Sequence, residues 1–222
     1  LDSETGKLLT MLAMGAGSLW RGYRLARRLF AQRPEVALGA LVFTAFNPMF
    51  VFISAAVNND NLIILLASIA LLWLVRLIEE GTSWGGVAML GVLCGLAALS
   101  KLSGLVLLPL TALALALRGW QEWHVQGGAL WPPLRRVLAQ FAVVAALAVL
   151  VAGWWYARNL RLYGELTGTQ TMLDIFGRRD HGATLSALWQ EFIGFRTSYW
   201  GLFGFFNVLL RPAWLYHVLD ML

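Results

Sequence analysis

Residues 54–62, with the sequence SAAVNNDNL, place three amides and one carboxylate between two long apolar runs. Each run, residues 36–57 and residues 62–78, is long enough or nearly so for a helix that crosses a bilayer core of roughly 30 Å. Together the two runs are too long for one straight span, so we expect the chain to turn at residues 58–61. A turn there puts a carboxylate at the boundary between membrane and water.

The polar residues of this turn have two open interpretations. Short amide and carboxylate side chains satisfy free backbone N–H groups at helix starts, so one role for Asn58, Asn59 and Asn61 is to cap the following helix. The other role is to bind a substrate. Asp60 is the stronger functional candidate, because an acidic side chain this close to hydrocarbon is costly and commonly serves a function.

The composition is that of an integral membrane protein. Of the 222 residues, 59% are hydrophobic and 13% are charged, whereas about a quarter of residues are charged in soluble domains. The net charge of +5 comes from basic residues at the ends of apolar runs, which favours lipid headgroups over nucleic acid as partners. The single cysteine, Cys94, excludes an internal disulfide.

The motifs of the common cofactor and metal enzymes are missing. The sequence holds no P-loop, no GxGxxG and no HExxH. Its histidines, His124, His181 and His217, are scattered and lack the spacing of metal ligands. We therefore expect neither a metal nor a cofactor.

The apolar runs predict an all-α fold, a polytopic transmembrane helical bundle of about six spans plus the start of another. The runs are residues 8–20, 36–57, 62–78, 84–100, 102–118 and 137–156. Pro48 predicts a kink inside the second run. The fourth and fifth runs would be about 52 Å long as one helix, so we expect a hairpin with Lys101 at its tip.

Three regions follow from this pattern. We expect residues 1–157 to form the transmembrane bundle, residues 158–211 an outer-face loop, and residues 212–222 the start of a further transmembrane helix. Apolar side chains at helical spacing predict a helix within the loop that lies in the membrane interface; they are Leu185, Leu188, Trp189, Phe192 and Phe195.

The two ends of the sequence suggest a fragment of a longer protein. The sequence starts at Leu1 without a methionine and stops at Leu222 inside an apolar run. We therefore expect further chain before Leu1 and after Leu222.

Basic residues near the spans predict the orientation. Alternating sides brings nine arginines together, namely Arg21, Arg24, Arg27, Arg28, Arg33, Arg76, Arg118, Arg135 and Arg136. The opposite side has four basic residues near spans, Lys7, Lys101, Arg158 and Arg161. By the positive-inside rule we expect a multi-pass protein of the plasma (inner) membrane with Arg21 to Arg33 in the cytoplasm. Asp60 and residues 158–211 then share the outer face.

Four polar features therefore converge on the outer face: Asp60, Lys101, the pair Arg158 and Asn159, and the loop. Each has an alternative explanation, since Lys101 can snorkel at a hairpin tip and Arg158 can hold lipid phosphates. Together, a carboxylate, an ammonium and a guanidinium suit an anionic lipid-linked substrate. The candidate site comprises Asp60 as a catalytic residue and Asn58, Asn59, Lys101, Arg158 and Asn159 as substrate-binding residues.

Several motifs carry a family resemblance when they are taken in order. They are residues 47–48 (NP), 54–60 (SAAVNND), 100–104 (SKLSG), 154–159 (WWYARN), 163–164 (YG) and 199–204 (YWGLFG). Together they resemble the DUF2142-type polytopic membrane proteins. Those proteins are related in pattern to the GT-C membrane glycosyltransferases, which include the dolichyl-phosphate-mannose and aminoarabinose transferase groups. The resemblance covers most of the chain, from about residue 40 to residue 216.

The resemblance implies transfer of a sugar from a polyprenyl-phosphate donor to an acceptor on the outer membrane face. Carried onto matching positions, Lys101 and Arg158 would hold the donor phosphate. Asp60, Asn59 and Asn159 would orient the sugar or the acceptor.

The resemblance also implies where the general base lies. In that family the base is an acidic residue in the first outer loop, soon after the first span. That loop would precede Leu1, so we expect the main catalytic carboxylate upstream of Leu1. Asp60 would be the base only if it faces the cavity.

A second interpretation belongs to another class of protein. The same polar residues would serve as helix caps and lipid anchors in a non-catalytic transmembrane subunit of a larger membrane complex. The expected partners are thus membrane lipids and a lipid-linked sugar phosphate, with membrane proteins in the second interpretation and no nucleic acid in either. A transporter is a weaker third interpretation, because the span interiors offer little beyond Asn47 as a polar path.

Overall fold

The computed structural model describes residues 3–81, 83–127, 129–178, 182, 184–204 and 207–221. Its elements in chain order are α1 (Ser3–Leu29), α2 (Pro34–Ala45), α3 (Pro48–Ala55), α4 (Asp60–Glu80), α5 (Trp84–Ser100), the 3-10 helix η1 (Leu102–Val106), α6 (Leu107–Gln126), α7 (Trp131–Tyr163), α8 (Thr169–Phe176), α9 (Leu185–Gly201), β1 (Leu202–Phe203), β2 (Val208–Leu209) and α10 (Leu215–Leu219). Helices therefore make up nearly all of the regular structure, which confirms the all-α prediction.

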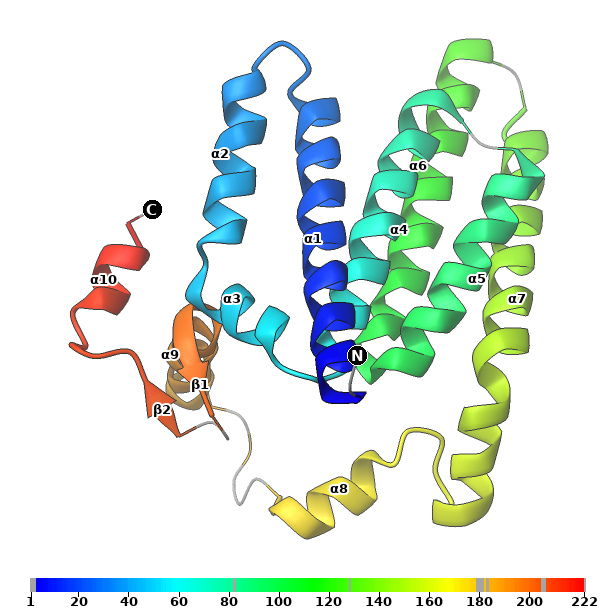
Figure 1. The fold of residues 1–222 in the computed structure, drawn as a ribbon. Coiled ribbons are helices and arrows are strands. Elements are labelled where there is room, and N and C mark those ends of the chain that lie inside the picture. Colours follow the sequence, from blue (N-terminus) through cyan, green and yellow to red (C-terminus); the bar gives the residue numbers. More distant parts are fainter. Residues whose placement is uncertain are drawn as a thin grey trace.

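The long helices stand side by side as a bundle (Figure 1). Helix α5 packs most extensively against α7, while α1 packs against α4 and α2. The core lies between α4, α5, α6 and α7, where Leu77, Leu90 and Val144 are almost fully buried. A Cβ atom at Gly91 would lie 2.9 Å from the carbonyl oxygen of Val144, so only glycine allows this approach of α5 to α7.

The prediction of six spans is not supported. Among the described residues, three segments are long and apolar enough to cross a membrane: α4, the continuous segment of η1 and α6, and α7. Helices α2 and α3 pass the same test only as a pair, which makes four. Hydropathy overcounted because α1 carries arginines along its second half and α5, at 17 residues, is shorter than a bilayer core.

The predicted kink at Pro48 is confirmed. Helices α2 and α3 are bent by 60° relative to each other, and α3 runs across the lower part of Figure 1 rather than along α2. The Asn47 side chain accepts a hydrogen bond of 3.0 Å from the backbone N–H of Phe50. The bend is thus closed by a capped helix start instead of a strained helix interior.

Helix α7 is longer than its apolar run. Its 33 residues extend about 50 Å, from Trp131 through Arg158 and Asn159 to Tyr163. The connection before it is correspondingly short, because α6 continues to Gln126. The candidate residues Arg158 and Asn159 therefore lie on the last turns of a helix and not in a loop.

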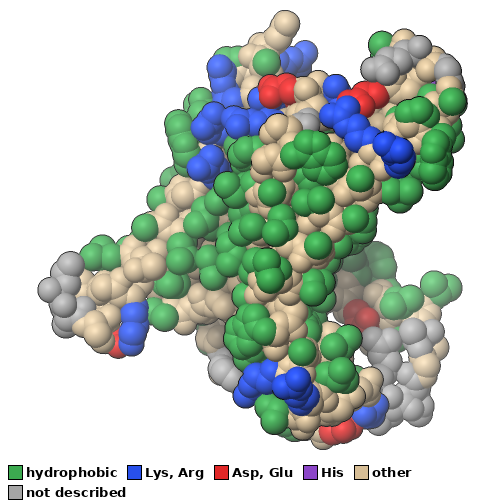
Figure 2. All heavy atoms as spheres, turned by 90° about the vertical axis from the view of Figure 1, so that its right-hand side faces the viewer, with side chains coloured by type: hydrophobic (Ala, Val, Ile, Leu, Met, Phe, Trp, Pro, Cys, Tyr) green, Lys and Arg blue, Asp and Glu red, His purple; other side chains and the backbone are tan. Residues whose placement is uncertain are grey.

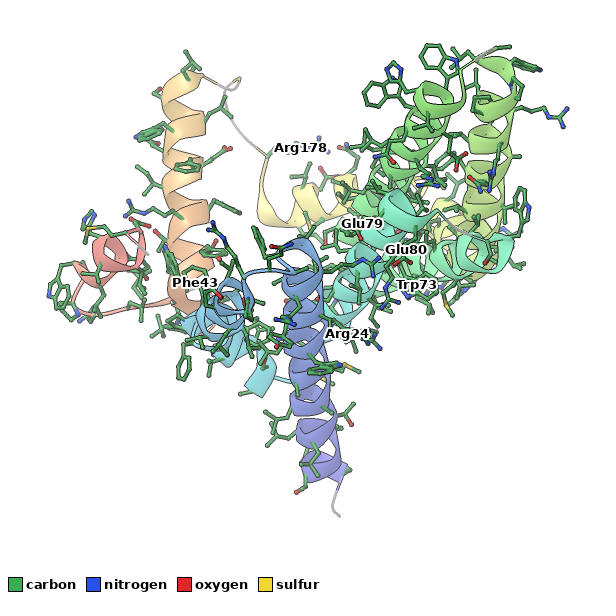
Figure 3. The ribbon with its side chains drawn as sticks, turned by 90° about the horizontal axis from the view of Figure 1, so that it is seen from above. Arg24, Phe43, Trp73, Glu79, Glu80 and Arg178 are labelled. Atoms are coloured by element: carbon green, nitrogen blue, oxygen red, sulfur yellow. The ribbon has the colours of Figure 1, made fainter. Side chains whose placement is uncertain are left out.

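The C-terminal part contains the predicted helix α9. Figure 1 shows α9 close to end-on behind β1 and β2, whereas Figure 3 shows it along its length, so α9 lies across the direction of α4. This direction is the one that an interfacial helix would take. Within residues 212–222 the structure has the short helix α10, which the Trp200 indole ties to α9 by a 2.9 Å hydrogen bond to Asp220.

The two end residues, Leu1 and Leu222, lie outside the described residues. The expectation that further chain precedes Leu1 and follows Leu222 therefore stays a prediction.

Charged side chains gather at the two ends of the bundle, and apolar side chains cover the surface between them (Figure 2). We call the end that carries the α1–α2 connection the Arg28 end and the end that carries the α5–η1 junction the Lys101 end (Figure 1). The multi-pass character predicted from the sequence agrees with this distribution.

Candidate active site

The turn between α3 and α4 is held by two asparagines with different tasks. The Asn58 side-chain oxygen accepts hydrogen bonds from the backbone N–H groups of Asp60 at 3.0 Å and Asn61 at 3.3 Å, so the predicted cap is confirmed for Asn58. The buried Asn61 amide instead donates to the carbonyl oxygens of Ile53 at 2.8 Å and Ala56 at 2.9 Å. These bonds satisfy the last carbonyls of α3 and fix where Asp60 begins α4.

Two contacts join this turn to the end of α5. Lys101 forms an ion pair with the carboxylate of Asp60, and the Asn59 amide donates a 2.8 Å hydrogen bond to the carbonyl oxygen of Ser100. The Lys101 and Asp60 side chains are 44% and 30% exposed, and pairs of this kind contribute about 0–1 kcal/mol to stability. The pair is thus accessible to a ligand and is not a main source of stability.

The main base expected upstream of Leu1 falls outside the described residues, which begin at Ser3. Its position therefore stays a prediction. The carboxylate that the structure does describe at this end of α4 is Asp60, and Lys101 engages it.

The geometry of the Lys101 backbone explains why its side chain is available here. Lys101 has an extended conformation between α5 and η1, which confirms the predicted break between the two runs. A Cβ atom at Gly104 would lie 2.2 Å from the carbonyl oxygen of Ala97, so η1 packs directly on the α5 backbone. The hairpin tip is therefore compact and projects Lys101 toward the start of α4.

Arg158 and Asn159 have separate surroundings on α7. The Arg158 guanidinium lies 5.1 Å from the ring centroid of Trp155, a cation–π contact at an exposed position. Asn159 is buried and donates a 3.2 Å hydrogen bond to the carbonyl oxygen of Leu166. In the described part of the chain, no hydrogen bond or ion pair links either residue to the Asp60–Lys101 pair. The structure thus joins only part of the predicted set.

The chain turns sharply at residues 164–168, between α7 and α8, and we call this turn the elbow. It was not predicted from the sequence. Gly164 ends α7 in the left-handed conformation at φ +72°. The Glu165 carboxylate accepts 2.8 Å hydrogen bonds from the backbone N–H groups of Gln170 and Thr171 at the start of α8. These bonds hold the pKa of the Glu165 carboxyl below its ordinary value. A glycine followed by a glutamate shortly before α8 was the available signal.

An apolar groove of about 320 Å³ lies between α7 and the α5–α6 hairpin. Its walls are Ala98, Leu105, Leu108, Ala145, Ala148, Val149, Ala152, Gly153, Tyr156, Leu166 and Thr167. The Tyr156 hydroxyl donates a 2.9 Å hydrogen bond to the carbonyl oxygen of Ala98 and so ties α7 to α5 at the groove. The elbow closes it through Leu166 and Thr167. Small residues on one face of α7 were its only trace in the sequence.

The described residues contain no group of three or more His, Cys, Asp or Glu side chains placed to hold a metal ion. His124 lies against the rings of Trp120 and Trp123 at the Arg28 end, and His217 lies on α10. His181 lies outside the described residues.

Comparison with known proteins identifies a family for this chain. The sequence profile of the dolichyl-phosphate-mannose-protein mannosyltransferase family matches residues 2–156, which is most of the chain and includes Asp60 and Lys101. Neither the curated proteins nor the solved structures contain a match. The match agrees with the apolar helices and with the GT-C relationship expected from the motifs. The chain therefore belongs to the dolichyl-phosphate-mannose-protein mannosyltransferase family and is a multi-pass membrane protein of the GT-C glycosyltransferase type.

Proposed function

We propose that this chain is part of a glycosyltransferase that transfers a sugar from a polyprenyl-phosphate donor at the outer face of the plasma membrane. The family supports the reaction class. The observation that carries the donor is the apolar groove between α7 and the α5–α6 hairpin, at the end of the bundle that also carries Lys101 and Arg158. At a finer level, we propose the DUF2142-type proteins as its relatives within the GT-C type.

The groove and the two cations match the two parts of a polyprenyl phosphate. The isoprenoid chain is apolar and fits a groove with apolar walls. Lys101 and Arg158 lie at the same end of the bundle as the groove residues Ala98 and Tyr156. Ammonium and guanidinium groups bind phosphate through charge-assisted hydrogen bonds. The phosphate would therefore lie at the Lys101 end with its chain in the groove.

The Asp60–Lys101 pair suggests how the acceptor is activated. A donor phosphate competes with Asp60 for the Lys101 ammonium and releases the carboxylate to accept the proton of the acceptor hydroxyl. The acceptor oxygen then bonds to the anomeric carbon as the bond from that carbon to the phosphate oxygen breaks, and polyprenyl phosphate leaves with its charge held by the cations. A carboxylate upstream of Leu1 would take the same role if Asp60 stays paired.

The asparagines divide into binding and positioning residues in this proposal. Asn59 is exposed, and its side-chain oxygen has no partner among the described residues, so we assign it to a sugar hydroxyl. Asn58 and Asn159 already use their side chains in the turn and the elbow. We therefore assign both to holding the site in shape.

The test is the binding of a polyprenyl phosphate to purified full-length variants, followed by native mass spectrometry. A lost charge-assisted contact costs about 1.5–3 kcal/mol, so we expect Lys101→Ala and Arg158→Ala to weaken binding about 10- to 100-fold. Arg161→Ala is the matched control, because Arg161 is exposed on the same last turns of α7. Equal binding by the wild type and both site variants would contradict the proposal.

One observation favours the non-catalytic subunit as a second candidate: the carboxylate that the reaction needs is engaged by Lys101. A subunit of this kind would bind the lipid and present it to a partner. It predicts polyprenyl-phosphate binding by the isolated chain without sugar transfer, together with a stoichiometric membrane-protein partner. Transfer by the purified chain alone would exclude it.

A further inference from the structure

A second pocket lies at the Arg28 end and plays no part in the proposed function. It has a volume of about 280 Å³ and lies between the end of α4 and the start of α5; its lining is Trp73, Arg76, Leu77, Glu80, Gly81 and Ser83. Figure 3 shows Trp73, Glu79 and Glu80 of α4 beside Arg24 of α1, which packs against α4. The pocket thus lies at the Arg28 end, which is the more basic end of the bundle, at the expected level of the membrane surface.

Arg76 differs from Arg28 and Arg118, two other partly buried arginines of this end. Arg28 forms ion pairs with Glu79 and Glu80, and Arg118 forms an ion pair of 2.9 Å with Glu122. The Arg76 Nε atom is buried and has no hydrogen-bond partner. No ion pair joins Arg76 to a residue in the described part of the chain.

The Nε atom is enclosed, so the groups of Arg76 that a ligand can reach are the terminal N–H groups of its guanidinium, which lines the pocket. A phosphate oxygen is the acceptor that a guanidinium binds best, since the planar donor pattern matches two phosphate oxygens. Glu80 lines the same pocket; it forms an ion pair with Arg28 and is attracted electrostatically by Arg76.

The apolar part of the pocket indicates where the phosphate comes from. Trp73 lies about 10 Å along α4 from the helix end at Glu80, and Leu77 lies between them in sequence. Tryptophan prefers the level where headgroups meet hydrocarbon. A ligand with its phosphate on Arg76 would therefore place its apolar part along Trp73, as a phospholipid does and a water-soluble phosphate ester does not.

We propose that this pocket binds the phosphate of a phospholipid headgroup, with Arg76 donating to the phosphate oxygens and Trp73 lying against the glycerol and upper acyl chains. The proposal is independent of the glycosyltransferase proposal, since its residues lie at the opposite end of the bundle. It adds a structural lipid site to the Arg28 end.

The test uses the full chain in detergent and native mass spectrometry with two probes. Short-chain phosphatidylglycerol is the lipid probe and glycerol 1-phosphate is the soluble one. We expect phosphatidylglycerol to bind the wild type, about tenfold weaker binding by Arg76→Gln and an intermediate loss for Arg76→Lys. Arg27→Gln is the matched control, because Arg27 is exposed at the same end and does not line the pocket.

The outcomes separate the parts of the proposal. Equal phosphatidylglycerol binding by the wild type and Arg76→Gln overturns it. If glycerol 1-phosphate binds as tightly as the lipid, and if this binding is lost in Arg76→Gln, the claim that the phosphate belongs to a lipid is overturned. A second measurement leaves Arg76 unchanged: phosphatidylglycerol brominated near the glycerol should quench wild-type fluorescence more than that of Trp73→Phe. No difference between these two proteins also overturns the proposal.

Discussion

The two ends of the bundle use charge differently. At the Arg28 end, ion pairs cross-link helices: Arg28 joins α1 to α4, and Glu122 binds Arg118 within α6 and Arg136 of α7. At the Lys101 end, the accessible Asp60–Lys101 pair joins α4 to the end of α5, and an apolar groove lies at the same end. Ion pairs at the first end thus hold helices together, whereas the pair at the second end is accessible to a ligand.

At the Arg28 end, an arginine also compensates the partial negative charge at the C-terminus of α4. The Arg118 guanidinium donates hydrogen bonds of 3.3 Å to the carbonyl oxygens of Ile78 and Glu79, which are among the carbonyls that a helix leaves unpaired at its C-terminus. At the Lys101 end the corresponding backbone groups are satisfied by asparagine amides. Neutral amides serve the backbone there, and in our proposal this leaves the cations Lys101 and Arg158 to bind the donor phosphate.

The largest expected effect comes from removing one charge at each end. Lys101→Ala should lower sugar transfer in reconstituted vesicles by about 100-fold or more, because a phosphate-stabilising cation is lost, while the melting temperature changes little. Arg28→Ala should keep transfer at permissive temperature and lower the melting temperature modestly, because Arg28 joins α1 to two carboxylates of α4 and each such exposed pair contributes about 0–1 kcal/mol. Each variant is measured in both assays.

The same two variants control for each other. A loss of transfer in Arg28→Ala in a protein that remains folded would remove the distinction between the ends. A melting temperature lowered more by Lys101→Ala than by Arg28→Ala would reverse it.

An intermediate effect is expected at Asn61, which stabilises the Lys101 end without a charge. Asn61→Ala removes the donor to the carbonyl oxygen of Ala56 and one of two donors to that of Ile53, and an unsatisfied buried group costs about 1–3 kcal/mol. We expect lower thermal stability and weaker polyprenyl-phosphate binding together, since the start of α4 carries Asp60. Asn59→Ala is the control, because Asn59 is exposed; an equal loss of stability in both would contradict the assigned role.

The smallest expected effect concerns the elbow between α7 and α8. Because the folded state lowers the pKa of Glu165 from its ordinary value of 4.5, the stabilisation is complete above that value. It is lost as the pH falls through the lower folded pKa. The hydrogen-exchange protection factors of residues 169–176, which correct for the slower intrinsic exchange in acid, should therefore fall in acid more than those of α4. Glu165→Gln should show low protection already at neutral pH, and high, pH-independent protection in the wild type would contradict the cap.

Local signals were predicted well from the sequence. The bend at Pro48, the turn before Asp60, the break at Lys101 and the helix after residue 184 all depend on residues within a few positions of each other. The number of spans was not supported because the apolar run of α1 leads into arginines and because α5, at 17 residues, is shorter than a bilayer core.

The candidate site was predicted only in part for a related reason. Its members were grouped by the side of the membrane they should share, which says nothing of their spacing across that face. The sequence was therefore sufficient to expect Asp60 and Lys101 near each other. It was not sufficient to predict that the Asn159 side chain points into the elbow. The groove was missed because its walls come from three helices.

The sequence by itself determined that this protein is an α-helical membrane protein with polar breaks at defined positions and an uneven distribution of arginines. Those properties follow from composition and from backbone rules that act over a few residues. Only the tertiary structure decided that Lys101 meets Asp60, 41 residues away, that an apolar groove forms between α7 and the α5–α6 hairpin, and that the Arg76 Nε atom is buried without a hydrogen-bond partner. These depend on how α4, α5 and α7 pack, which is set by contacts between residues far apart in the chain.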